Sequence, residues 1–252
     1  MTNINRPFFS IGIPTYNRKS LLKQTLLSIL EQTFSDFEVI VGNDFPDEAL
    51  SLEMLGIDDK RVNIVNHRQN MGELENMNVL LSMAKGKYFT WEFDDDPCAP
   101  STLSEVYATL IKSDYPQCVF TSFEFIYGTS FNKFNTIYNY QTQLYSGRDF
   151  LRKYLSGGLN ALGCCGFYNI DYLKNIGGAK RLTNGPMALH SEHLLLIGAG
   201  MLSKVAYINA PLVSSRIHLN SWTCSNSSVE LFEQAGINLI RESIVVLLND
   251  SL

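Results

Sequence analysis

Apolar runs and amphipathic stretches alternate through the first part of this chain. Apolar runs of this length, each ended by polar or turn residues, are typical of strands buried on both faces of a parallel sheet. Between the first two runs, Leu22, Leu26 and Ile29 recur on one face of a helix. The apolar runs cover residues 8–13, 37–44, 62–65 and 87–93, and the helical stretches cover residues 19–33 and 73–84. This order predicts an α/β fold with a mostly parallel sheet and right-handed crossover connections.

Polar side chains follow three of these predicted strands. Thr15 and Tyr16 come after the first strand, Asn43 and Asp44 end the second, and Asp94–Asp96 follow the last. Ligands of such sheets bind beyond the carboxyl ends of the strands. The sequence therefore predicts that these groups meet in one site at one edge of the sheet.

Three consecutive aspartates, Asp94–Asp96, are the most distinctive part of that site. Carboxylates this close repel one another, and each raises its neighbour's pKa unless a cation or hydrogen-bond donors hold them ionised. A divalent cation is one explanation. The alternative is a solvated acidic turn before a helix whose positive end favours carboxylates.

Composition excludes several classes of protein. The chain has 252 residues, 45% of them hydrophobic, so it can bury a large core. Its formal net charge is −5 and it has no long basic block, which argues against nucleic acid as a partner. We find no signal-peptide pattern and no apolar stretch long enough for a membrane span. Five cysteines without a CxxC motif fit neither a disulfide framework nor a zinc site, so we expect reduced thiols and a cytoplasmic protein.

The second half is less regular. Residues 118–145 alternate like extended strand and are rich in Phe and Tyr. We expect helices at about 147–155, at 191–199 and from about 227 onward, and separate strands at 205–208 and 211–218. No internal repeat or long linker divides the chain, so the two halves are predicted to share one core.

Four blocks of this sequence, in this order, carry a resemblance to a known family. They read "IPTYNR" after the first strand, "QTFSDFEVIVGND" around the second, "NMGELENMNVLLSMAKGKYFTWEFDDDPCAPSTL" through the aspartates, and "LVSSRIHLNSW" near the end. The chain resembles a family 2 glycosyltransferase with the GT-A fold. The resemblance implies one domain over residues 1–222, with a Rossmann-like nucleotide-sugar half at 1–115 continuous with a smaller acceptor half at 116–222. Residues 223–252 would then form a helical extension.

The resemblance implies a binding site for a nucleoside diphosphate sugar, with UDP favoured. Tyr16 would stack on the base or ribose, and Asp44 would accept a hydrogen bond from the base, with Thr15 nearby. The alternative for Tyr16 is an ordinary aromatic that covers the strand end. Asn43 stands where many relatives carry an aspartate. The matching blocks also assign the following residues to the nucleotide site: Pro14, Arg18, Asn70, Gly72, Asn78 and Asp94.

The aspartates resemble the acidic metal motif of this family. Carboxylate oxygens suit Mg²⁺ or Mn²⁺, which keep positions free for phosphate oxygens. We expect Asp95 and Asp96 as metal ligands, with Asp94 facing the ribose or the sugar. The late block adds His218 as a metal or phosphate ligand, with a satisfied structural histidine as the alternative.

The catalytic base is predicted in the stretch "ALHSEHLLLIGAG". The family usually has an acidic pair there, and in this chain Glu192 matches its first position while His193 replaces the second. Either side chain can accept a proton near neutral pH when its environment tunes it. We favour Glu192, with His193 second. The alternative is a helix start in which Ser191 is the cap.

The resemblance implies an inverting transferase that moves a sugar to a hydroxyl of a saccharide or lipid-linked acceptor, in bacterial surface polysaccharide synthesis. A binding domain that has lost its base is one rival, kept open by His193. A sugar-phosphate nucleotidyltransferase is the other, although "PTYNRK" lacks the expected glycine-rich loop. Peripheral contact with the inner face of the membrane stays open for the C-terminal helix, which has few basic residues. The oligomeric state is not predicted.

Overall fold

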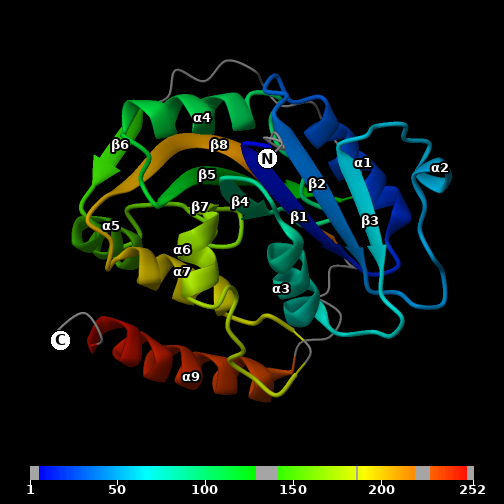
Figure 1. Cartoon of the computed structure of the whole chain (residues 1–252). Helices are drawn as coiled ribbons and strands as arrows, with labels where there is room; N and C mark the ends of the chain where they lie inside the picture. Colours follow the sequence, from blue (N-terminus) through cyan, green and yellow to red (C-terminus); the bar gives the residue numbers. More distant parts are fainter. Residues whose placement is uncertain (1–5, 129–140, 186, 219–227, 249–252) are drawn as a thin grey trace, which may run out of the picture.

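The computed structural model describes residues 6–128, 141–185, 187–218 and 228–248. In these residues one sheet has the strand order β3-β2-β1-β4-β7-β5-β8-β6, and helices cover both of its faces (Figure 1). The strands are β1 Phe9–Thr15, β2 Phe37–Asn43, β3 Val62–Asn66, β4 Tyr88–Trp91, β5 Cys118–Tyr127, β6 Thr142–Tyr145, β7 Phe167–Asn169 and β8 Val205–Ile217. The helices are α1 Lys19–Leu30, α2 Leu52–Leu55, α3 Glu73–Met83, α4 Thr102–Lys112, α5 Gly147–Leu155, α6 Ile170–Asn175, α7 Ser191–Ala199 and α9 Val229–Leu248.

The pairing of the strands confirms the predicted α/β fold. β1 pairs in parallel with β2 and β4, and β2 pairs in parallel with β3. β7 lies antiparallel between β4 and β5, and β5 then pairs in parallel with β8. The sheet therefore continues from the first half of the chain into the second without a break.

The two strands predicted at 205–208 and 211–218 are a single strand, β8, so that prediction was wrong. The register between β5 and β8 shifts on both sides of Ser122, which lies opposite Pro211. A proline has no N–H to donate and is tolerated where pairing is irregular. The strand thus passes through Pro211 at a bulge instead of ending there.

Two apolar cores lie on opposite faces of the sheet. Leu22 and Leu26 of α1 and Val106 of α4 belong to the core of one face. Leu80 of α3 and Leu196 of α7 belong to the core of the other face. Figure 1 shows α4 on one side of the sheet, with α3, α6 and α7 on the other and α9 beyond them.

Strand β8 returns to the segment that follows β4. The Ala99 N–H donates to the Leu212 carbonyl at 2.8 Å, and the Ser214 N–H donates to the Pro97 carbonyl at 3.0 Å. These bonds hold the residues just after the aspartates against the far half of the sheet. The segment that carries the aspartates is therefore fixed at one end by β4 and at the other by hydrogen bonds to β8.

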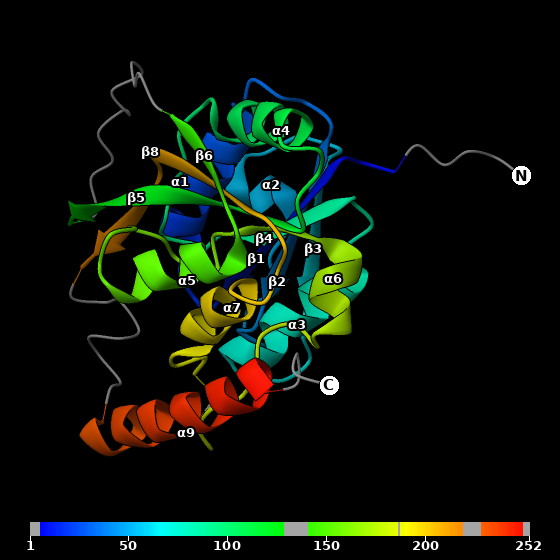
Figure 2. The same cartoon turned by 90° about the vertical axis from the view of Figure 1, so that its left-hand side faces the viewer.

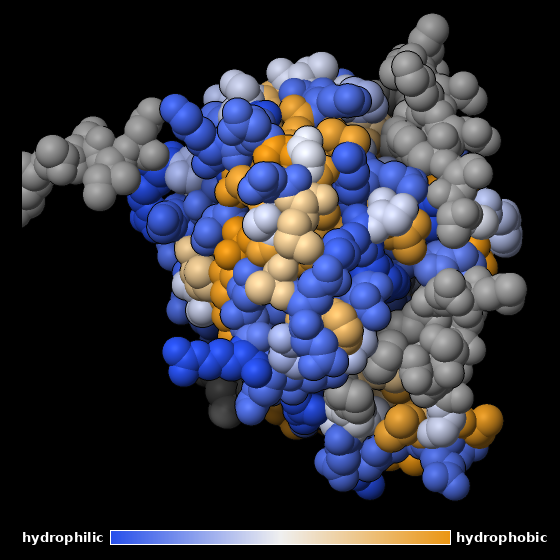
Figure 3. Space-filling view, turned by 90° about the vertical axis from the view of Figure 1, so that its right-hand side faces the viewer, coloured by the Kyte–Doolittle hydropathy of each residue, from blue (hydrophilic) through white to orange (hydrophobic). Residues whose placement is uncertain are grey.

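The edge strand β3 lies on the side of the molecule that Figure 3 presents, where hydrophilic residues are interspersed with hydrophobic ones. Asn63 and Asn66 of this strand are exposed. Polar side chains on an edge strand discourage pairing with another chain.

The predicted C-terminal helix is confirmed as α9, which lies outside the main body (Figure 2). Its Ala235 is buried with Met187 and Leu189, and Asn238 Nδ2 donates to the Leu182 carbonyl at 2.8 Å. In the described part of the chain no helix is both long and apolar enough to cross a bilayer. Only one face of α9 is thus covered by the domain.

Gln32 holds α1 to the segment that follows the aspartates. Its Nε2 donates to the Ala99 carbonyl at 2.6 Å, and its Oε1 accepts the Leu103 N–H of α4 at 2.9 Å. The side chain of Ser101, which precedes α4, makes no capping bond. Gln32 therefore takes the place of the missing cap.

Replacing Gln32 with alanine leaves a buried carbonyl and a buried N–H without this partner. We expect Gln32→Ala to lower the free energy of unfolding by about 2 kcal/mol in urea denaturation. The exposed neighbour Glu31 is the control. Glu31→Ala should change the free energy of unfolding by less than about 0.5 kcal/mol. Equal effects of the two substitutions would contradict this role for Gln32.

Candidate functional site

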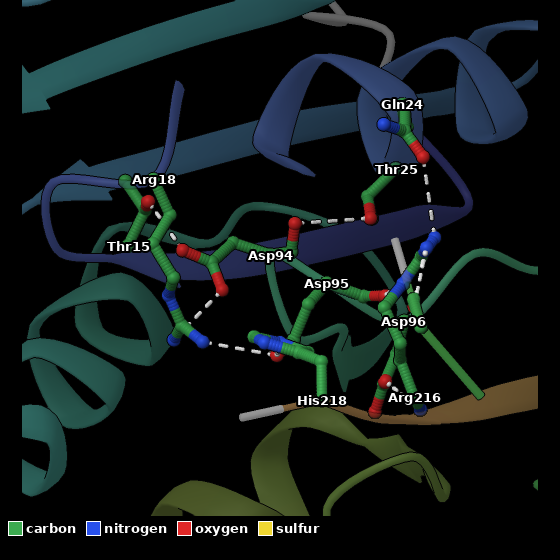
Figure 4. Close-up of polar contacts among 10 residues, drawn as sticks. Thr15, Arg18, Gln24, Thr25, Asp94, Asp95, Asp96, Arg216 and His218 are labelled. Atoms are coloured by element: carbon green, nitrogen blue, oxygen red, sulfur yellow. Dashed lines mark hydrogen bonds and ion pairs between the residues drawn. The ribbon is translucent and has the colours of Figure 1, made fainter. Parts of the chain in front are cut away.

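The three aspartates are buried. Asp94 is 0% exposed, Asp95 8% and Asp96 5%. Figure 4 shows them surrounded by side chains from the β1–α1 region and from the end of β8. The alternative of a solvated acidic turn is therefore wrong, because these carboxylates have exchanged water for protein partners.

Asp94 is held by the segment that follows β1. Thr15 Oγ1 donates to Asp94 Oδ2 at 2.5 Å, and Arg18 Nη2 lies 2.9 Å from Asp94 Oδ1 without forming a well-aligned hydrogen bond. Burial raises the pKa of Asp94 to about 7, Arg18 opposes this rise, and the Asp95 charge adds to it. Arg18 thus only partly offsets the burial of this carboxylate.

Asp95 and Asp96 face different partners. Asp95 Oδ2 lies 2.9 Å from Arg18 Nη1 and 3.0 Å from His218 Nε2. Asp96 Oδ1 instead accepts the Arg216 N–H of β8 at 2.7 Å, and Arg216 Nε donates to the Asp95 carbonyl at 2.7 Å. Burial and the Asp95 charge raise the pKa of Asp96 well above its usual range. Asp96 is thus bonded to β8, whereas Asp95 is paired with Arg18 and His218. Metal binding by Asp96 stays a prediction.

A divalent cation fits two of the predicted ligands. A carboxylate oxygen and an imidazole nitrogen are both donors that divalent cations use in proteins. In this structure Asp95 Oδ2 and His218 Nε2 are hydrogen-bonded to each other at 3.0 Å. Within the described residues no group of three or more His, Cys, Asp or Glu side chains is arranged to hold a metal ion. A metal ion held by Asp95 and His218 stays a prediction.

The predicted base-binding residues lie beyond the ends of β1 and β2. Tyr16 is 39% exposed, and its ring meets that of Phe45 edge to face with centroids 5.3 Å apart. Asp44 is buried and accepts the backbone N–H groups of Met71 at 2.7 Å and Gly72 at 2.8 Å. Each carboxylate oxygen retains a second lone pair. Phe45 was not predicted, although an aromatic residue directly after Asp44 could have indicated it.

Several other predicted nucleotide residues shape the backbone around the site. Asn70 Oδ1 accepts the Gly72 N–H at 2.9 Å, and Gly72 has a φ of 85°, a conformation that glycine adopts easily. Asn78 Nδ2 donates to the Ala179 carbonyl at 2.9 Å and its Oδ1 accepts the Ala179 N–H at 3.0 Å. Pro14 lies inside β1. Nucleotide contacts by these residues stay predictions.

The predicted bases stand at the start of α7. The residue before this helix is His190, with a φ of 59° and no side-chain capping bond. Ser191 Oγ instead accepts the Lys180 N–H at 3.0 Å, so the interpretation of Ser191 as a cap was wrong. A Cβ on Gly163 would lie 2.0 Å from the Glu192 carbonyl oxygen. The turn at Gly163 therefore backs closely onto the helix start.

Glu192 and His193 differ in how far they are already engaged. His193 Nδ1 lies 2.6 Å from the Tyr154 hydroxyl, and burial lowers the pKa of His193. The Glu192 carboxylate has no hydrogen-bond partner among the described residues, and burial raises its pKa. A carboxylate with a raised pKa is a better base near neutral pH than an ordinary one. Among the described residues, His193 is therefore already bonded to another side chain, whereas the Glu192 carboxylate is not.

A further carboxylate, Glu73, was not predicted. It begins α3, and its Oε2 accepts the Ala188 N–H at 2.9 Å. Burial raises the pKa of Glu73, Arg18 lowers it, and the charges of Glu192 and Asp95 raise it further. An acidic residue at a helix start is ordinary in sequence, so nothing in the pattern indicated this position.

The family described as "Glycosyl transferase family 2" matches residues 10–177 of this chain. Over 113 residues the chain is 34% identical to an uncharacterized glycosyltransferase of Haemophilus influenzae, a match that covers 44% of this chain and 35% of the relative. Over 101 residues it is 35% identical to the GalNAc(5)-diNAcBac-PP-undecaprenol beta-1,3-glucosyltransferase of Campylobacter jejuni, covering 39% of this chain and 33% of the relative. The matches thus span about a third of the length of these relatives.

Solved structures of TarS from S. aureus share the fold. One, a complex of TarS 1–349 with UDP, superposes with a TM-score of 0.70 at 16% identity and covers 97% of this chain and 66% of that one. Another, with UDP-GlcNAc, has a TM-score of 0.71 at 16% identity, with 97% of this chain and 67% of that one covered. At this identity the likeness concerns the fold alone.

The raised pKa of Asp94 predicts a pH dependence of stability. An unfolded aspartate loses its proton near pH 4, whereas Asp94 in the folded protein does so at about pH 7. Between these values the unfolded state binds fewer protons, so the free energy of unfolding falls as the pH rises through this window. Urea denaturation at pH 5 and at pH 8 measures this fall in the free energy of unfolding. We expect it to be smaller for Asp94→Asn than for the wild type. The exposed Asp149→Asn is the control, and a fall in Asp94→Asn as large as in the wild type would contradict the assignment.

Proposed function

This chain belongs to glycosyl transferase family 2, and on that premise we propose that it transfers a sugar from a nucleoside diphosphate sugar to a hydroxyl group of a saccharide or lipid-linked saccharide. The observation that carries the proposal is the buried cluster of Asp94, Asp95, Arg18 and His218 beyond the ends of the parallel strands. The proposed base, Glu192, lies near enough for its charge to act on Glu73, as Arg18 and Asp95 also do.

A UDP-sugar is the donor that we favour. The support is the fold shared with TarS, whose solved complexes hold UDP and UDP-GlcNAc. In this proposal Tyr16 and Phe45 offer aromatic surface to the base or ribose, and Asp44 accepts a base N–H with the lone pairs that Met71 and Gly72 leave free. A buried acceptor of this kind penalises a base that cannot donate to it.

A divalent cation, Mn²⁺ or Mg²⁺, is part of the proposal. Asp95 and His218 would hold it, with Asp94 towards the ribose or sugar and Asp96 supporting the loop from its contact with β8. Bound there, the ion would act as a Lewis acid that stabilises the charge of the departing diphosphate. Arg18, already beside both carboxylates, would add positive charge on the donor side.

Glu192 is the residue that we assign as catalytic base. It would take the proton of the acceptor hydroxyl while that oxygen attacks the anomeric carbon from the side opposite the diphosphate. One such displacement inverts the configuration, through a transition state with oxocarbenium character. His193 is turned to Tyr154 and is the second candidate.

The acceptor class rests on the relatives. The Campylobacter jejuni relative is named for an undecaprenol-linked glycan, which supports a lipid-linked saccharide and a role in bacterial surface polysaccharide synthesis. We place the reaction in the cytoplasm, at the inner face of the membrane when the acceptor is lipid-linked. A sugar-phosphate nucleotidyltransferase is disfavoured because the segment after β1 has no glycine-rich phosphate loop.

The donor site can be tested by thermal unfolding with UDP, dTDP and GDP, each with and without Mn²⁺. A ligand at about a hundred times its Kd adds about 2.7 kcal/mol, which raises the Tm of a domain of this size by about 5 to 10 °C. We expect UDP to raise the Tm only when Mn²⁺ is present. Asp95→Ala should abolish the rise and the exposed Asp149→Ala should preserve it. A wild-type Tm that no nucleotide raises in the presence of Mn²⁺ would count against the donor site.

The base can be tested by separating turnover from donor binding. We expect Glu192→Gln to lower kcat by about a hundredfold or more, because a general base contributes about 10² to 10⁴ in rate, while the Kd of UDP stays within about twofold. His193→Asn should lower kcat far less. If the two variants exchange these effects, His193 is the base. If wild-type protein binds UDP and transfers no sugar to any acceptor, the chain is a binding domain.

A further inference from the structure

The first turns of α3 hold the segment that leads into α7. Glu73 Oε2 accepts the Ala188 N–H at 2.9 Å, and Arg181 Nη2 donates to Glu75 Oε1 at 2.9 Å. Glu73 is half-buried, whereas the Glu75–Arg181 pair is exposed to solvent. The contact of Glu73 is therefore the better shielded of the two.

The Ala188 N–H lies just before the residues that place the proposed base. His190, two residues on, takes the left-handed conformation with a φ of 59°, and Glu192 follows in the first turn of α7. A backbone that passes through such a conformation persists only when its surroundings determine it. Besides the Ala188 bond, the Lys180 N–H donates to Ser191 Oγ at 3.0 Å. The Ala188 bond is the tie that joins this turn to α3.

On its other side Glu73 is joined to the donor site. It follows Gly72, whose N–H donates to Asp44 Oδ2 at 2.8 Å. Asp44 in turn holds its backbone bond to the end of β1, with its N–H donating to the Thr15 carbonyl at 2.9 Å. Hydrogen bonds thus lead from the end of β1 through Asp44 to Gly72, and from its chain neighbour Glu73 to the turn before Glu192.

We propose that Glu73 is a positioning residue for sugar transfer, which sets the start of α7, and with it the Glu192 carboxylate, relative to the donor site. The proposal rests on the proposed function of Glu192. Transfer requires the base and the donor to be held in one geometry, and small displacements of a catalytic group are costly in rate. Glu73 acts through the Ala188 N–H and takes no proton from the acceptor.

Two substitutions separate the hydrogen bond from the charge. In Glu73→Gln the side-chain oxygen can still accept the Ala188 N–H, whereas Glu73→Ala removes the acceptor. Glu75→Ala is the matched control, since it breaks the exposed pair that α3 makes with the same segment. Thermal unfolding of each variant verifies that it is folded.

In a transfer assay with UDP-sugar and acceptor, we expect Glu73→Ala to lower kcat at least about tenfold while the Kd of UDP stays within about twofold. Glu73→Gln and Glu75→Ala should stay within about threefold of the wild type, an amount within which a preserved geometry leaves the barrier nearly unchanged. An equal loss in Glu73→Gln and Glu73→Ala would overturn the proposal, because the charge and not the hydrogen bond would then matter. Wild-type kcat in Glu73→Ala would also overturn it.

Hydrogen exchange gives a readout that does not depend on activity. We expect the amides of residues 187–194 to exchange about tenfold faster in Glu73→Ala than in the wild type, and at the wild-type rate in Glu73→Gln. Unchanged exchange in Glu73→Ala overturns the proposal whatever the activity. If the wild-type protein transfers no sugar but hydrogen exchange changes as expected, the result counts against the proposed function. The role of the Glu73–Ala188 hydrogen bond in holding the start of α7 would then still be established.

Discussion

Three adjacent carboxylates inside a folded protein need partners, and the way this chain supplies them organises the molecule. Thr15 and Arg18 reach Asp94 and Asp95 from the segment after β1, while Arg216 reaches the aspartate segment from β8. Buried charge pairs add little net stability, but removing one partner leaves an uncompensated charge that costs about 3 to 5 kcal/mol. The cluster therefore specifies which distant segments meet more than it adds to stability.

The same contacts join the two halves of the chain. The sheet runs unbroken from β3 to β6, and β8 delivers Arg216 and His218 to a site that begins in the first half. A second tie runs through α3, where Glu73 holds the Ala188 N–H and Asn78 holds Ala179. A transferase must keep donor and acceptor groups in register, and two independent ties across the halves give that rigidity.

The sequence predicted one contact of the candidate site from the ends of the strands. Thr15 and Asp94 were expected together because carboxyl ends of parallel strands share one edge, and in the structure Thr15 Oγ1 donates to Asp94 Oδ2. The sequence did not predict that Asp96 turns to the Arg216 N–H, nor that Asp44 is already bonded to Met71 and Gly72. Side-chain direction within a loop depends on donors from elsewhere in the chain, which no local pattern records.

By itself the sequence determined the α/β order, the buried strands β1, β2 and β4 and the family blocks, because periodicity and strand-end polarity are local properties. The run at 62–65 is instead an edge strand, β3, in which only Val62 is buried. Only the tertiary structure decided that residues 205–217 form one strand through Pro211 and that the aspartates are buried. It also decided that His193 meets Tyr154 while the Glu192 carboxylate has no hydrogen-bond partner in the described part of the chain. It alone revealed Glu73, whose partner Ala188 is 115 residues away. The physical reason is that burial and hydrogen-bond pairing depend on which distant segments pack together, and an acidic residue at a helix start has the same local pattern whatever it later faces.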